Sequence, residues 1–76
     1  MRDQLLLAFG KALREHRTRR GMSQEQLALT AEVDRTFVSQ IERGINQPSL
    51  LTLWKLASAL DVRPSALLAR TEKIVR

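Results

Sequence analysis

Two short helical patterns within residues 23–44 constrain the fold of this chain more than any other feature. The first begins at Ser23, and Gln26 three residues later has the spacing of a capping box. The second begins at Asp34, which is a favourable residue at a helix N-cap. The two predicted helices span residues 24–31 and 35–43, and a tight turn joins them.

The second of these helices has two unlike faces when its residues are placed at about 100° per residue. Asp34, Val38 and Ile41 share one face, and Phe37 and Glu42 flank it. The opposite face holds polar side chains and no acid, namely Arg35, Thr36, Ser39, Gln40 and Arg43. Guanidinium and amide groups pair with guanine and adenine edges in the major groove of DNA. This face is therefore a candidate surface for contact with DNA bases.

The chain resembles the helix-turn-helix family of phage repressor and Cro proteins. Within the motif the similarity is carried by Gln24, Leu27-Ala28, Val38, Ile41 and Glu42-Arg43-Gly44. It extends over about residues 6 to 69, through Phe9-Gly10, Leu13, Arg17, Gly21-Met22, Gln47-Pro48-Ser49-Leu50, Leu56-Ala57, Leu60, Pro64 and Leu67. The resemblance implies an all-α, compact five-helix repressor-like domain that binds DNA in a sequence-specific way and regulates transcription. Among short family members, the run 34–39 looks most like the controller proteins of restriction–modification systems.

The turn after the first motif helix departs from the family pattern. Glu32 stands where the family usually has glycine. A residue other than glycine at positive φ costs on the order of 1 kcal/mol. We expect the turn to form with Glu32 strained or slightly reshaped.

Three further helices are expected around the motif. The first spans about residues 3–20, buries Leu6, Phe9, Leu13 and His16, and ends at Gly21. After a loop over 44–48, a fourth helix is capped by Ser49. Its inward side chains are predicted to be Leu50, Leu53, Leu56, Ala57 and Leu60. A short fifth helix begins at Pro64, and the charged tail 71–76 is expected to fray.

Composition limits the remaining possibilities. Seventy-six residues fit one small domain, 1–76, and a net charge of +5 suits a polyanionic partner. Cysteine is absent, which fits a reducing cytoplasm, and the apolar run 5–9 is far too short to span a bilayer. We expect no membrane association, no cofactor and no small-molecule ligand.

The resemblance assigns roles to the polar residues of the motif. Arg35, Thr36 and Gln40 match the family positions that read bases. The expected contacts to the DNA backbone are Gln24, Ser39, Arg43, Asn46 and Gln47. An anion is favourable at a helix N-terminus, which supports a phosphate beside Gln24. The competing interpretation is an ordinary solvated polar surface.

A structural ion pair between Arg17 and Glu42 is also implied by the resemblance, linking the first helix to the end of the second motif helix. The alternative role for Arg17 is a phosphate contact. Lys11, Arg14, Arg19 and Arg20 form a basic face that either approaches phosphate or is simply solvated.

No catalytic or metal-binding set is evident. His16 is the single histidine, and with no cysteine it is expected to be a partly buried residue of the first helix. No glycine-rich phosphate loop is present, and no Ser-His-Asp set can be assembled. We therefore expect a protein that is not an enzyme and that holds no metal.

Leu51, Trp54 and Leu68 lie off the predicted core stripe of the last two helices. Aromatic and aliphatic residues that a small domain leaves uncovered are common in interfaces. We predict a two-fold homodimer through this region, with Ile74 or Val75 assisting, on a palindromic operator. The alternatives are that Trp54 packs on its own core, or that an antitoxin-like or adaptor module binds a partner protein through helices four and five.

Overall fold

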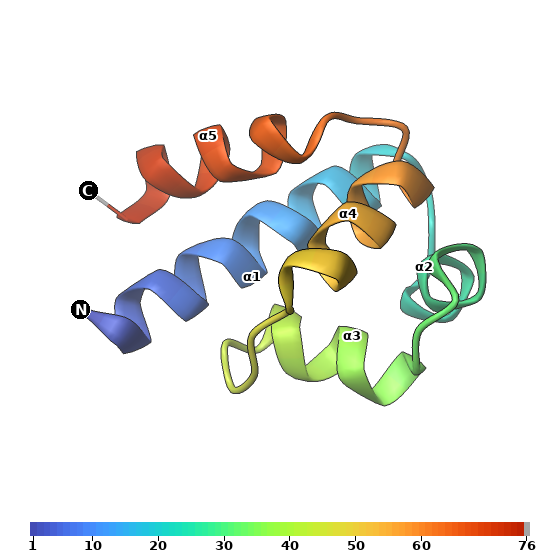
Figure 1. The fold of residues 1–76 in the computed structure, drawn as a ribbon, viewed down its shortest axis with the longest axis horizontal. Coiled ribbons are helices and arrows are strands. Elements are labelled where there is room, and N and C mark those ends of the chain that lie inside the picture. The colour runs from blue at the N-terminus through green and yellow to red at the C-terminus, as the bar shows by residue number, and fades with distance from the viewer. Residues whose placement is uncertain (76) are drawn as a thin grey trace.

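The computed structural model describes residues 1–75, and these form five α-helices and no strand. The helices are α1 (Arg2–Arg19), α2 (Gln24–Ala31), α3 (Arg35–Glu42), α4 (Leu50–Ala59) and α5 (Pro64–Val75). Helices α1 and α5 lie side by side and run in opposite directions, so both ends of the chain are at the same end of the molecule (Figure 1). The predicted all-α, five-helix architecture is confirmed.

A single cluster of apolar side chains joins the helices. The largest side chains that are less than 2% exposed are Leu13, Leu27, Val38, Ile41, Leu56, Leu60 and Leu67, so α1 to α5 all contribute. Burying one such side chain stabilises the fold by about 1.5–3 kcal/mol. The core therefore fixes the position of α3, which contributes Val38 and Ile41 to it.

Side-chain caps set where the motif helices begin. Ser23 Oγ accepts from the backbone N–H of Gln26 at 3.0 Å, and Gln26 Oε1 accepts from the backbone N–H of Ser23 at 2.8 Å. Asp34 Oδ1 accepts from the N–H of Thr36 at 2.8 Å, and Ser49 caps α4 in the same way. Each cap is worth about 1 kcal/mol. The predicted bounds of α2 are confirmed, whereas α3 ends one residue earlier than predicted.

The observed bounds of α1 and α5 differ from those predicted from the sequence. Helix α1 begins at Arg2 and ends at Arg19, one residue earlier than predicted at each end. Helix α5 is neither short nor frayed over 71–75, because it continues to Val75. Thr71 is buried on α5, and its Oγ1 donates to the Leu67 carbonyl at 2.7 Å. Packing against α1 thus orders this segment, and Arg76 lies outside the described residues.

The position of Leu50 also differs from the sequence-based prediction. The apolar stripe of the fourth helix predicts that Leu50 faces inward, yet this residue is 72% exposed. It shares the stripe of Leu53 and Leu56, but it is the first residue of α4 and lies beyond the end of the core. Leu50 instead lines a shallow hollow of about 240 Å³ together with Leu5 and Leu68.

Glycine permits a close approach between α1 and the end of α3. A Cβ atom added at Gly10 would lie 2.5 Å from the carbonyl oxygen of Ile41 and 2.7 Å from that of Glu42. Gly44, two residues after α3, has φ +76°, and a Cβ atom added there would lie 2.6 Å from a methyl carbon of Leu7. The two helices therefore contact each other through backbone, with no room for a side chain at Gly10.

The turn between α2 and α3 has the strained geometry expected at Glu32, with φ 59° in the left-handed region. Replacing Glu32 with glycine is expected to raise the free energy of unfolding by about 1 kcal/mol, because glycine has no Cβ to strain and the Glu32 side chain is exposed. Urea unfolding of the purified variant measures this. Asp61, at φ 58°, is the matched control: Asp61→Gly should gain less, since aspartate tolerates this region better. A Glu32→Gly variant no more stable than the parent chain would contradict the strain.

Candidate nucleic-acid interface

Helix α3 presents a polar face away from the core. On the opposite side of this helix, Val38 is 0% and Ile41 1% exposed, and both side chains pack into the core. Arg35, Thr36 and Arg43 are exposed, and Ser39 and Gln40 are half-buried. The one acid within the helix, Glu42, points inward with its side chain 4% exposed. The outer face of α3 consequently offers guanidinium, hydroxyl and amide groups without a competing carboxylate.

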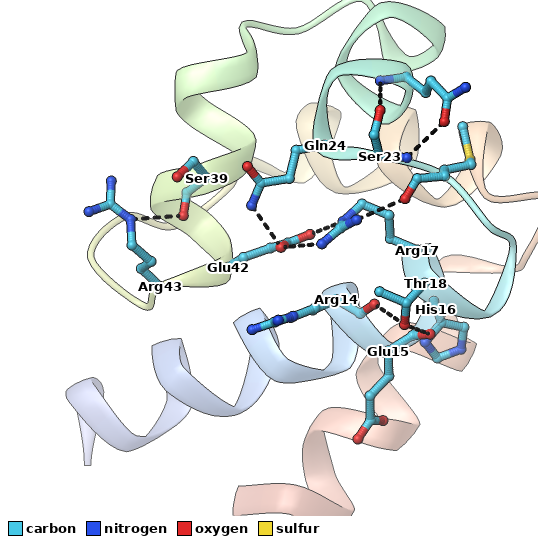
Figure 2. A network of polar contacts seen from close by, with 12 residues as sticks. Arg14, Glu15, His16, Arg17, Thr18, Ser23, Gln24, Ser39, Glu42 and Arg43 are labelled. Carbon is cyan, nitrogen blue, oxygen red and sulfur yellow. Dashed lines mark hydrogen bonds and ion pairs between the residues drawn. The ribbon is translucent and has the colours of Figure 1, made fainter.

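Glu42 is the centre of a polar network that ties three helices together (Figure 2). Arg17 Nε lies 2.6 Å from Glu42 Oε2, and Arg17 Nη2 donates to Glu42 Oε1 at 3.0 Å. Arg17 Nη1 donates to the carbonyl of Met22 at 2.8 Å. The Arg17 side chain is only 11% exposed, so this is a largely desolvated, two-bond ion pair. The pair has the structural geometry that the resemblance implies, and the guanidinium of Arg17 is committed within the fold.

Gln24 joins the same network, a contact that no sequence pattern predicts. Its Nε2 donates to Glu42 Oε1 at 3.0 Å, so the first residue of α2 is bonded to the last residue of α3. Figure 2 shows the Gln24 side chain lying across from the Arg17–Glu42 pair. An amide nitrogen carries two N–H groups, so one donor of Gln24 stays available. The contact fixes where that donor points.

The loop after α3 is bonded to the outer face of that helix. Asn46 Nδ2 donates to Gln40 Oε1 at 3.2 Å, and Asn46 Oδ1 accepts from the backbone N–H of Gln47 at 2.8 Å. Arg43 Nε reaches the carbonyl of Ser39 at 3.4 Å, a long contact that leaves its other donors outward. The structure thus links Gln40, Asn46 and Gln47 by hydrogen bonds and places Arg43 against Ser39.

The basic residues of α1 and its C-cap residue Arg20 differ in whether they have an acidic partner. Lys11, Arg14, Arg19 and Arg20 are all exposed, and Arg20 Nη1 lies 3.6 Å from Asp61 Oδ2. Glu15 forms a bidentate pair with Arg70 of α5, at 2.7 and 3.1 Å. The hydrogen bond from Arg70 lowers the pKa of the Glu15 carboxyl below its ordinary value. This pair is solvent-exposed and adds little to stability.

His16 and the apolar surface residues Leu51, Trp54 and Leu68 belong to α1, α4 and α5. His16 is half-buried, with Nδ1 2.9 Å from the carbonyl oxygen of Ala12. Leu51 is 66%, Trp54 55% and Leu68 47% exposed, so Trp54 does not pack fully on its own core. Across residues 1–75, no helix is long and apolar enough to cross a membrane.

Two helices joined by a short turn, α2 and α3, with a donor-rich face of the second directed outward, have the arrangement of a helix-turn-helix motif. The chain belongs to this family, because residues 13–67 match the family model described as helix-turn-helix. The control protein C.BamHI of Bacillus amyloliquefaciens is 41% identical over 90% of this chain and 85% of its own length.

Two solved structures extend the comparison. The restriction–modification controller protein C.AhdI from Aeromonas hydrophila is 48% identical with a TM-score of 0.80, covering 82% of this chain and 94% of its own. The controller protein C.Esp1396I, solved as a tetramer with its natural 35-base-pair operator, is 28% identical with a TM-score of 0.84, covering 93% of each chain.

Proposed function

We propose that this chain is a sequence-specific, double-stranded DNA-binding transcriptional regulator of the controller type, acting as a homodimer on a palindromic operator. The observation that carries the proposal is the outward face of α3, which is held rigidly by Val38 and Ile41 and bears no carboxylate. The operator complex of C.Esp1396I supports it, because that relative shares this fold. Such a regulator acts on DNA in the cytoplasm.

Each side chain has a role that follows from its chemistry. Arg35 is proposed to bridge O6 and N7 of a guanine, and Gln40 to bridge N6 and N7 of an adenine. Thr36 offers a hydroxyl to a base edge or a methyl group to thymine. Backbone contacts are assigned to Gln24, Ser39, Arg43, Asn46 and Gln47. These contacts would set the register of α3 in the groove without selecting a sequence.

In vitro selection of duplexes from a random pool tests the proposed function. A homodimer places two copies of α3 one helical turn apart, about 34 Å, so the recovered sites should be palindromes with that half-site spacing. Binding should weaken steeply with added salt, because phosphate contacts release counterions. A pool that shows no enrichment after selection would contradict sequence-specific binding.

The proposed homodimer uses Leu51, Trp54 and Leu68, and replacing Trp54 and Leu68 together with alanine is expected to weaken self-association. The two changes remove apolar area that only an interface would cover, since both side chains are about half exposed in one copy. Sedimentation velocity over a concentration series measures the effect.

A matched control removes exposed apolar side chains elsewhere. Leu29 on α2 is 74% exposed and Ile45, after α3, is 62% exposed. The Leu29→Ala, Ile45→Ala variant should therefore dimerise like the parent chain. If the Trp54→Ala, Leu68→Ala variant self-associates equally well, the proposed interface is wrong.

A further inference from the structure

Arg14 lies at the edge of α1 that faces α3. Gly10 and Arg17, on the same side of the helix, contact Ile41 and Glu42 at the end of α3. Arg14 falls between them in the sequence and is exposed. Figure 2 shows its side chain leaving α1 beside the Arg17–Glu42 pair, on the side away from Gln24, and extending toward the end of α3.

The charge at this junction is not balanced. Arg17 is paired with Glu42, Arg20 with Asp61, and Arg70 with Glu15. Within the described part of the chain, neither Arg14 nor Arg43 forms an ion pair. Glu42 neutralises Arg17 alone, so the guanidinium groups of Arg14 on α1 and of Arg43 directly after α3 keep their charge. An exposed guanidinium group without a carboxylate partner is available to attract an anion such as phosphate.

We infer that Arg14, in addition to the contact already proposed for Arg43, binds a phosphodiester of the DNA backbone beside the groove that α3 enters. The inference rests on the proposed function, and it adds a residue of α1, outside the two-helix motif, to the DNA contacts. A helix lying in the major groove has a sugar–phosphate backbone on each side. Arg14 leaves α1 beside the neutralised Arg17–Glu42 pair. Its contact is to phosphate, so it strengthens binding to every sequence alike.

The test compares Arg14→Gln with Arg19→Gln. Arg19 is also an exposed arginine of α1, but it lies with Glu15 and Arg70 on the side of the helix near α5. Affinity is measured for a random-sequence duplex and for a selected site over a series of salt concentrations. The slope of log affinity against log salt should fall by about 0.9 per protomer in Arg14→Gln, the value for one phosphate contact. Arg19→Gln should keep the parent slope.

Two results would overturn the inference. One is a parent-like salt slope in Arg14→Gln, and the other is a loss confined to the selected site, which would make Arg14 a reader of bases. Unfolding midpoints of both variants should match the parent chain, because both side chains are exposed. Failure of the proposed function would give a different result, because the parent chain would then bind selected and random duplexes with equal affinity. The salt slopes of Arg14→Gln and Arg19→Gln on random duplex would still test the Arg14 contact.

Discussion

Replacing Glu42 with alanine is expected to lower the free energy of unfolding by about 3–5 kcal/mol. The change leaves the guanidinium of Arg17, which is 11% exposed, without its carboxylate in a largely dry site. It also removes the acceptor of Gln24, so the bonds from α3 to both α1 and α2 are lost. Chemical denaturation of the parent chain and the variant measures the difference.

Glu15→Ala is the matched control, because Glu15 also forms a two-bond pair with an arginine but in an exposed position. Its effect should be far smaller, since water screens the pair. Replacing both partners, as in Arg17→Met with Glu42→Leu, should cost less than the two single changes together, because no buried charge is left unpaired. Equal losses in Glu42→Ala and Glu15→Ala would show that burial of the Arg17–Glu42 pair is not what makes it important.

Replacing Gly10 with alanine is expected to lower the free energy of unfolding by about 1–3 kcal/mol. The added methyl group would lie 2.5 Å from the carbonyl oxygen of Ile41, so α1 and α3 must move apart. Helix propensity alone has the opposite sign, because alanine in a helix interior is favoured over glycine by about 0.5–1 kcal/mol. The direction of the change therefore distinguishes tertiary packing from local preference.

Lys11→Ala controls for helix propensity, since Lys11 is the exposed neighbour of Gly10 on α1. Its stability should stay close to that of the parent chain. Thermal and urea unfolding of both variants give the comparison. A Gly10→Ala variant more stable than the parent would mean that α1 and α3 do not approach as closely as the structure shows.

Local chemistry made the motif predictable from the sequence. Ser23 and Asp34 cap their helices through bonds to residues two or three positions away, so the starts of α2 and α3 follow from nearby sequence alone. The outward face of α3 follows from the spacing of Val38 and Ile41 for the same reason. The Arg17–Glu42 pair joins residues 25 positions apart, and only family resemblance indicated it.

Contacts between distant residues account for what the sequence did not reveal. The bonds of Gln24 to Glu42 and of Glu15 to Arg70 span 18 and 55 residues, and no helical period marks them. The clash at Gly10 depends on how closely α1 and α3 pack, which periodicity does not report. Leu50 fits the apolar stripe of α4 but lies past the end of the core, so pattern and burial disagree there.

Reading of bases by α3 is tested most directly by comparing Arg35→Ala with Arg43→Ala on a selected site, on its single-base variants and on random duplex. Arg35→Ala should lose about 1–3 kcal/mol of discrimination at one base pair, because one arginine–guanine contact is removed. Arg43→Ala should weaken binding to all of these duplexes by a similar factor, as expected for a phosphate contact. Equal loss on the selected site and on random duplex for Arg35→Ala would contradict a base-reading role for the outer face of α3.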